Sequence, residues 1–225
     1  SVSHRKHASI VTLPRLLPHA IGFLFKKEID TLTKIKEQPT RPFVVIIGGL
    51  KIVTKISSLP GLLKNADYVL LGGKTANVVL TVKGICVGRP WPSDEKIVKI
   101  IRKLDITNQS LHLPIDVVVT LEETGSHYLR ETGPGNVRKE ERIFDIGKET
   151  IKKFTRIISE AKTIVWSGPL GFVEKKQFSQ GTETIVKAIV ENKKSFNVAG
   201  GGDTIKTIKK FGVLDKFSYI STGGS

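Results

Sequence analysis

A glycine cluster near the end of the chain has the composition of a phosphate-binding turn. Gly200-Gly201-Gly202 separates a short apolar stretch from Asp203 and a basic amphipathic segment. Glycines let the backbone pass close to a ligand, and the free N–H groups of a helix start point at an anion. Asp203 can then serve a metal ion that accompanies the phosphates. The alternative is that the glycines only form a tight turn and that Asp203 only N-caps the helix.

Two lysines follow a second glycine pair. Gly48-Gly49 comes directly after an apolar run, and Lys51 and Lys55 stand four residues apart at the start of the next amphipathic segment. This spacing places both side chains on one face of a helix, where they can follow the charge of neighbouring phosphates. A solvated helix face is the alternative, but the position directly after the glycines favours the phosphate role.

Glycine turns recur where other predicted strands end. They are Gly72-Gly73-Lys74, Ser167-Gly168-Pro169-Leu170-Gly171 and Ser221-Thr222-Gly223-Gly224. Ligands of open parallel sheets bind beyond the carboxyl ends of the strands, so we expect these turns to place backbone donors and cations around one crevice. Neither Gly-x-x-x-x-Gly-Lys-Ser/Thr nor a Gly-x-Gly-x-x-Gly after the first strand is present, which argues against an ordinary P-loop enzyme or a dinucleotide dehydrogenase.

Apolar runs alternate with amphipathic segments, and this alternation predicts the elements that hold the turns. Short apolar runs predict strands at residues 43–47, 68–71, 117–120, 163–166, 195–198 and 217–220. Helical periodicity predicts helices at residues 13–38, 52–63, 75–82, 93–104, 149–161, 182–192 and 204–211. Together they predict an α/β fold: a doubly wound, Rossmann-like, six-stranded parallel sheet with helices on both faces.

Three features lie outside this alternation. The polar residues 122–142 contain Gly133-Pro134-Gly135 and are interpreted as an extended loop or a small excursion. Asp145, together with Gly147, is expected to cap the helix that follows. His112 and Asp116 are interpreted as structural.

The composition favours anionic partners. The 225 residues carry a formal net charge of +15, which suits nucleotide phosphates, acidic metabolites or nucleic acid, whereas a lysine-rich solvated surface is the alternative. No apolar run is long enough to span a bilayer and no signal peptide is evident, so we expect a soluble, cytoplasmic protein without a membrane partner. Cys86 is the only cysteine, which excludes an internal disulfide. Because methionine is absent, we expect residues before Ser1.

Several sequence blocks together resemble the phosphoglycerate kinase family. In order they are Arg41-Pro42-Phe43, Ile46 to Ile56, Val165 to Gly171, Gly200 to Thr204 and Ser221 to Gly224. The resemblance covers nearly the whole chain and is to the C-terminal, nucleotide-binding half of that two-domain enzyme. On this basis residues 1–40 are expected to hold the end of the N-terminal domain and an interdomain-type helix, and residues 41–225 the nucleotide-binding α/β domain.

The resemblance implies an activity and a set of site residues. The family transfers phosphate between 1,3-bisphosphoglycerate and ADP, so Mg²⁺ with ADP or ATP is the implied cofactor and an adenine nucleotide the implied partner. Arg5 stands where a family arginine contacts the triose substrate, and Asp203 is the implied metal ligand. The implied catalytic residues are Lys51, Lys55, Gly201 and Gly202. The implied nucleotide-binding residues are these four with Gly48, Gly49, Gly72, Gly73, Phe144, Ser167, Gly168, Pro169, Leu170, Glu174, Gly200, Asp203 and Thr204.

The chain also departs from the family pattern. Thr54 stands where Asp is usual, Ser167 where Asn is usual, and Lys74 and Ser225 where a third glycine is usual. The family block Trp-Met-Gly-Leu-Asp-Ile-Gly-Pro is replaced by residues 141–148, which puts Ile143 beside the expected adenine slot. Most of the triose-binding domain has no counterpart here, so we expect the isolated chain to bind nucleotide without completing the transfer.

These departures motivate an alternative function. The chain would then be a non-catalytic single domain that holds another anion, a nucleic acid or a partner. Nucleic acid ranks lower because no aromatic stacking platform is evident. The apolar face of residues 13–38 is consistent with docking of an N-terminal domain or with self-association.

Overall fold

A central parallel sheet organises the protein. The structure is a computed structural model that describes residues 6–86, 94–122 and 128–223. Six strands lie in the order β3-β2-β1-β7-β8-β9, and every neighbouring pair is parallel. Their bounds are β1 (Phe43–Ile47), β2 (Tyr68–Leu71), β3 (Leu111–His112), β7 (Thr163–Ser167), β8 (Phe196–Gly200) and β9 (Tyr219–Ser221). The predicted fold class is therefore confirmed.

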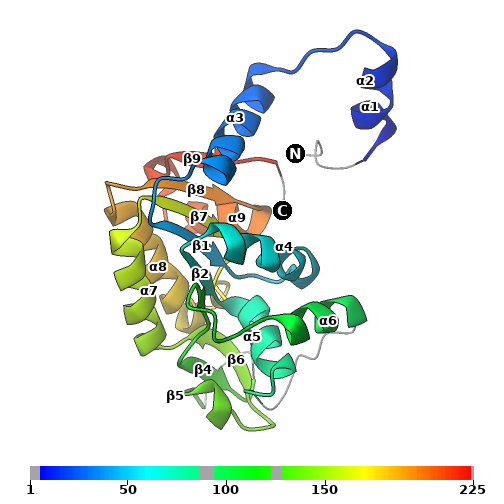
Figure 1. Cartoon of the computed structure of the whole chain (residues 1–225). Helices are drawn as coiled ribbons and strands as arrows, with labels where there is room; N and C mark the ends of the chain where they lie inside the picture. The colour runs from blue at the N-terminus through cyan, green and yellow to red at the C-terminus, as the bar shows by residue number, and fades with distance from the viewer. Residues whose placement is uncertain (1–5, 87–93, 123–127, 224–225) are drawn as a thin grey trace.

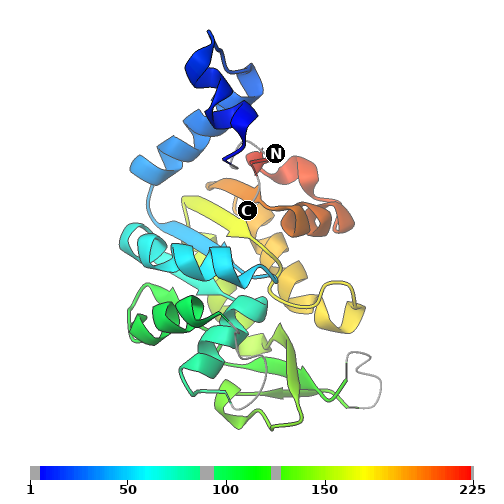
Figure 2. The same ribbon diagram turned by 90° about the vertical axis from the view of Figure 1, so that its right-hand side faces the viewer.

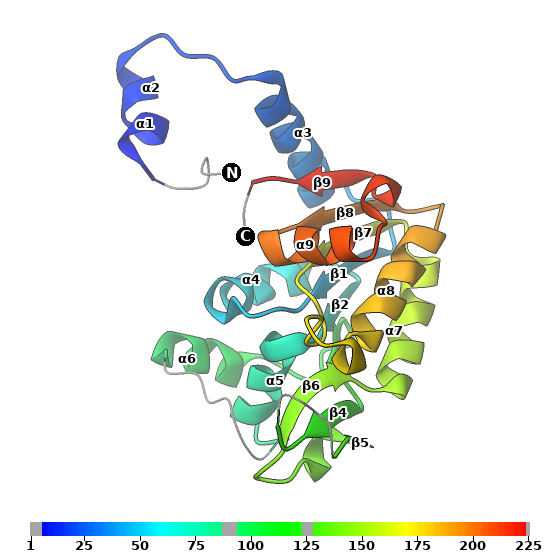
Figure 3. The same ribbon diagram turned by 180° about the vertical axis from the view of Figure 1, so that it is seen from behind.

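Helices cover both faces of this sheet, as Figure 1 and the view from behind in Figure 3 show. Alternate residues of β1 explain why: Val45 and Ile47 pack into one apolar cluster, and Val44 and Ile46 into the other. The first cluster is covered by α3 (Phe23–Glu37), α4 (Ile52–Asn65), α5 (Gly73–Val82) and α6 (Glu95–Lys103). The second is covered by α7 (Lys148–Glu160), α8 (Gln180–Glu191) and α9 (Gly202–Lys210).

One predicted strand of the main sheet belongs elsewhere. Residues 117–120 form β4 (Val117–Thr120), the middle strand of a separate antiparallel sheet with β5 (Arg130–Thr132) and β6 (Arg142–Ile146). Val117 and Val119 are buried while Val118 is not fully covered, so this strand has one buried face, unlike β1. The edge position of the main sheet is taken by β3, and the polar residues 122–142 supply β5 instead of a plain loop.

A buried carboxylate ties this second sheet together. Glu141 is 2% exposed and accepts hydrogen bonds from the Arg130 guanidinium, the Tyr128 hydroxyl and the Arg138 amide. These bonds, led by that from Arg130, lower the pKa of Glu141 to about 2. The sequence reading missed this network because its members come from separate parts of a polar segment.

The predicted helix over residues 13–38 is broken. The chain forms α1 (Ala8–Val11), α2 (Leu13–Leu16) and then α3 from Phe23, because Pro18 and Gly22 interrupt the helical pattern. Figure 2 shows this segment rising from one end of the sheet. Phe23 and Leu24 are 94% and 85% exposed. Among the described residues, no helix combines the length and apolar character that a membrane span requires.

The cap of α7 comes from Asp116, not from Asp145 as predicted. The Asp116 carboxylate accepts hydrogen bonds from the Glu149 and Thr150 amides at 2.8 and 2.7 Å. Asp145 instead accepts from the amides of Ile146 and Gly181, at 2.9 and 2.8 Å. The cap therefore lies far from α7 in sequence, where a local pattern could not reveal it.

This cap yields a stability prediction. Asp116→Ala is expected to lower the free energy of unfolding by about 2 kcal/mol, because the first turn of α7 loses its acceptors. Asp116→Asn keeps one acceptor oxygen and should recover part of the loss. Urea denaturation followed by circular dichroism measures both. An unchanged midpoint for Asp116→Ala would show that the cap contributes nothing.

Candidate functional site

The glycine turns after β1, β2 and β7 interlock at the carboxyl edge of the main sheet. The Gly49 amide donates to the Pro169 carbonyl at 2.6 Å, and the Gly73 amide donates to the Leu170 carbonyl at 2.9 Å. A Cβ on Gly48 would overlap the Pro169 carbonyl oxygen. The turns do gather at one edge, but these amides bond within the protein and do not face a ligand, which corrects the expectation that they line a crevice as donors.

Two threonine hydroxyls hold the turn after β7. Thr204 accepts from the Gly168 amide at 2.7 Å and donates to the Gly200 carbonyl at 2.8 Å, so it links the ends of β7 and β8. Thr182, on α8, accepts from the amides of Leu170 and Gly171 at 3.0 and 3.1 Å. Sequence reasoning found Thr204 and missed Thr182, which no glycine turn accompanies.

The start of α9 is the best anion-binding feature of this edge. Gly201 is the N-cap with a φ of +99°, a value that favours glycine, and no side chain caps the helix. The first intrahelical bond runs from the Ile205 amide to the Gly201 carbonyl, so the amides of Gly202, Asp203 and Thr204 have no helical acceptor. Asp203 lies in the first turn and is not the N-cap, so the simple capping alternative is wrong.

Lys55 is held beneath the glycine turns. Its ammonium group donates to the Gly48 carbonyl and, at 3.0 Å, to the Ser167 carbonyl, and the residue is only 9% exposed. Burial lowers the pKa of Lys55 to about 8; the nearby Asp203 opposes this shift and Lys51 adds to it. The structure thus brings the two predicted lysines and the predicted metal ligand into one electrostatic neighbourhood.

Thr54, where the family usually has Asp, lies on the first turn of α4. Its hydroxyl donates to the Lys51 carbonyl at 3.3 Å. The contact is a local helix-start bond, so Thr54 supports the position of Lys51 without adding a negative charge.

A cavity of about 550 Å³ opens beside these turns. This volume lies within the range of about 300–1,000 Å³ usual for small-molecule sites. The predicted site residues that line it are Gly49, Gly73, Phe144, Pro169, Leu170, Glu174 and Asp203. The predicted residues outside its wall are Gly48, Lys51, Lys55, Gly72, Ser167, Gly168, Gly200, Gly201, Gly202 and Thr204. Arg5 lies outside the described residues.

The second sheet supplies the far wall of the cavity. Phe144 stacks on Phe178 with ring centroids 4.8 Å apart, and Asn77 donates to the Ile143 carbonyl at 3.4 Å. Lys74 and Arg142 add cations to the wall. Sequence reasoning missed Asn77 and Arg142, since neither stands in a glycine turn.

Asp145 supports this wall from below. Burial raises the pKa of its carboxyl to about 7, against the hydrogen bonds from the Gly181 and Ile146 amides. An added Cβ on Gly171 or Gly181 would overlap this carboxylate, so both glycines are needed for the close packing. Asp145 is therefore a buried anchor that joins β6 to α8 and to the turn after β7.

A divalent cation at this edge would need ligands from the nucleotide. Among the described residues, no group of three or more His, Cys, Asp or Glu side chains is placed to hold a metal ion. Asp203 does provide one carboxylate on the cavity wall. One carboxylate combined with phosphate oxygens and water is the usual environment of Mg²⁺, so the residues fit this ion.

The fold and this edge together define a doubly wound α/β domain with its candidate site at the carboxyl ends of the strands. The family model for phosphoglycerate kinase matches residues 1–225. The chain therefore belongs to the phosphoglycerate kinase family, and the resemblance drawn from its sequence blocks is confirmed.

Individual relatives agree with this family. The phosphoglycerate kinase of Orientia tsutsugamushi strain Boryong is 42% identical over 231 residues, and that of Desulfosudis oleivorans is 38% identical over 228 residues. The chain spans 57% of the length of each. Among solved structures, phosphoglycerate kinase from Coxiella burnetii aligns with a TM-score of 0.82 and 34% identity, over 91% of this chain and 53% of that one. The enzyme from Pyrococcus horikoshii OT3 aligns with a TM-score of 0.79 and 30% identity, over 99% and 57%.

Proposed function

We propose that this chain binds Mg-ADP or Mg-ATP as the nucleotide-binding half of a phosphoglycerate kinase. The observation that carries the proposal is the 550 Å³ cavity, which has Asp203 and the uncapped start of α9 at one end and Phe144 at the other. Phosphates at the helix start would meet free amides and the positive end of the helix dipole. The base would then lie toward the wall formed by the second sheet.

The residues at the phosphate end have distinct proposed roles. Lys55 is held by neutral carbonyl groups, and a phosphate offers the same ammonium group a full negative charge. Lys51 is exposed at the N-cap of α4 and adds a second cation. Bound Mg²⁺ would neutralise phosphate charge, and Asp203 would provide its protein carboxylate. Phosphoryl transfer depends mainly on positioning and charge stabilisation, which these groups supply.

The reaction proposed for the whole enzyme is transfer between 1,3-bisphosphoglycerate and ADP. Arg5 is the only triose-contacting residue proposed within this chain. We therefore propose that this chain alone binds nucleotide without appreciable turnover of 3-phosphoglycerate.

Isothermal titration calorimetry with Mg-ADP and Mg-ATP tests the binding proposal. We expect saturable binding with a Kd below about 1 mM, equivalent to at least about 4 kcal/mol. The absence of binding at millimolar nucleotide would overturn it. A coupled assay with 3-phosphoglycerate and ATP tests the second part, because appreciable turnover would contradict the proposed need for a triose-binding domain.

The pH dependence of this binding follows from Lys55. In the free protein its ammonium group loses a proton above about pH 8, whereas a bound phosphate favours the charged form and raises the pKa. Affinity for Mg-ADP should therefore be level from pH 7 to about 8 and then fall by up to about tenfold per pH unit. Titrations across this range measure the profile. A flat profile up to pH 9.5 would show that the Lys55 charge does not contribute.

A further inference from the structure

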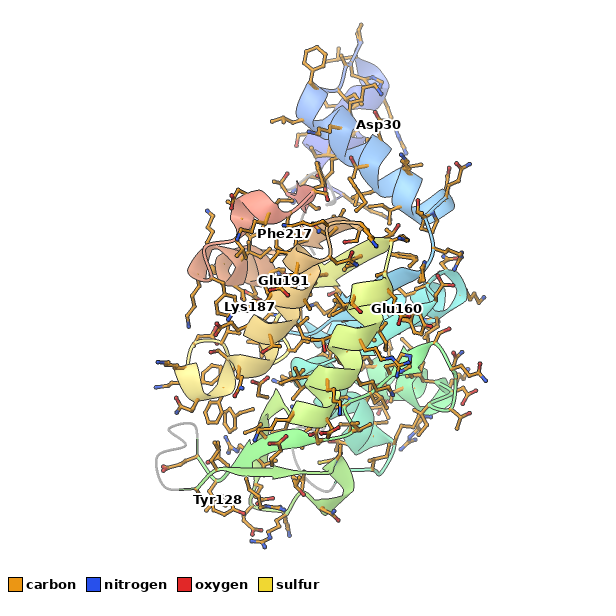
Figure 4. All side chains as sticks on the ribbon, turned by 90° about the vertical axis from the view of Figure 1, so that its left-hand side faces the viewer. Asp30, Tyr128, Glu160, Lys187, Glu191 and Phe217 are labelled. Carbon is orange, nitrogen blue, oxygen red and sulfur yellow. The ribbon has the colours of Figure 1, made fainter. Side chains whose placement is uncertain are left out.

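A second concave surface lies on the outer side of α7 and α8, the two helices that face the viewer in Figure 4. This α7–α8 groove has a volume of about 770 Å³ and shares no lining residue with the nucleotide cavity. Its floor includes Ala188 and Asn192, and the Asn192 amide is fixed by donating to the Ile158 and Ala161 carbonyls at 2.7 and 2.9 Å. The groove is therefore a separate feature with a fixed floor.

The rim of the α7–α8 groove is strongly basic. Lys187 pairs with Glu183 at 2.8 Å, and Glu191 is the one acidic residue of the lining. The other four cations of the lining have no carboxylate within ion-pair distance among the described residues: Lys152, Arg156, Lys193 and Lys194. Their charges converge on a concavity instead of dispersing over a convex surface. A ligand with several negative charges would complement this rim.

The hydroxyl groups of the lining narrow the chemistry of that ligand. Thr155 donates to the Ile151 carbonyl at 2.9 Å, Ser159 to the Arg156 carbonyl at 2.7 Å, and Thr184 to the Gln180 carbonyl at 2.9 Å. Because each hydroxyl proton is used within its own helix, the oxygens offer acceptor lone pairs to the groove. A complementary ligand therefore brings hydrogen-bond donors as well as anions.

We propose that the α7–α8 groove binds the ribose-phosphate backbone of single-stranded RNA. Phosphates pair with the four free cations, and the 2′-hydroxyl, which is both donor and acceptor, bonds to the threonine and serine oxygens. DNA lacks this hydroxyl, and inorganic polyphosphate lacks any comparable donor. A volume typical of small-molecule sites suits a few nucleotides of one strand and not a duplex. The absence of a stacking platform makes the binding independent of base sequence.

Fluorescence anisotropy with a labelled twelve-nucleotide oligouridine at 50 mM salt tests the proposal. The groove variant removes all four cations: Lys152→Gln, Arg156→Gln, Lys193→Gln and Lys194→Gln. The matched control removes the same charges from exposed positions on α3, α4 and α6: Lys34→Gln, Lys64→Gln, Lys99→Gln and Arg102→Gln. We expect the groove variant to lose at least 30-fold in RNA affinity and its plot of log K against log salt to become shallower by about 3. The control should lose less than fivefold.

Each remaining arm separates this site from another explanation. The DNA oligomer of the same sequence should bind at least fivefold more weakly than the RNA, and polyphosphate of equal charge should compete poorly. Saturating Mg-ADP should leave RNA affinity unchanged. Equal losses in the two variants, equal affinity for DNA, displacement by Mg-ADP, or no RNA binding at all would each overturn the proposal. Nucleotide titration of the groove variant, expected to match wild type, reports that the variant is folded.

Discussion

Replacing Lys55 with glutamine is expected to weaken Mg-ADP binding roughly 10- to 100-fold. Hydrogen bonds to charged groups contribute about 1.5–3 kcal/mol each, and glutamine removes the charge while keeping a donor. The effect should exceed that of losing any exposed lysine because Lys55 is only 9% exposed, where solvent screens its charge poorly. Isothermal titration calorimetry at pH 7 measures the change.

The matched control for this variant is Lys64→Gln, at the exposed last turn of the same helix. It removes the same charge far from the glycine turns and should change the Kd less than twofold. Urea denaturation of both variants shows whether either has lost its fold. If a folded Lys55→Gln protein bound Mg-ADP as tightly as wild type, the phosphate role of this residue would be rejected.

Gly48→Ala is expected to destabilise the protein by about 3 kcal/mol, since overpacking against a fixed backbone costs about 1–3 kcal/mol and sometimes more. The added Cβ would overlap the Pro169 carbonyl, which is itself bonded to the Gly49 amide. The turns after β1 and β7 would have to separate, and both contribute to the cavity wall. We therefore expect weaker nucleotide binding along with the lower stability measured by urea denaturation.

Gly61→Ala is the comparison for this substitution. Gly61 lies within α4, and no atom outside the helix's own backbone lies within 4 Å of an added Cβ. Alanine there should raise stability by about 0.5–1 kcal/mol, because glycine is a poor helix former. Equal midpoints for Gly48→Ala and wild type would contradict the close packing of the turns.

Local pattern was enough for most of the framework. The unbroken apolar run of β1 and the periodicity of α7 and α8 predicted their type and approximate place, because burial on one or two faces leaves its period in the sequence. Local pattern was misleading for β4, where three consecutive valines resemble a fully buried strand although only one face is covered. It was also misleading for residues 13–38, where apolar spacing continued across Pro18 and Gly22.

By itself, the sequence determined the alternation of strands and helices, the glycine turns at the strand ends and the family to which they belong, because each of these is encoded in short contiguous stretches. Tertiary structure alone decided which groups remain available to a ligand. Gly49 and Gly73 bond to the turn after β7, Asp116 reaches across to cap α7, and Lys55 becomes buried. Each of these contacts joins segments far apart in the chain or depends on the packing around them, so their energies exist only once the sheet has brought the segments together.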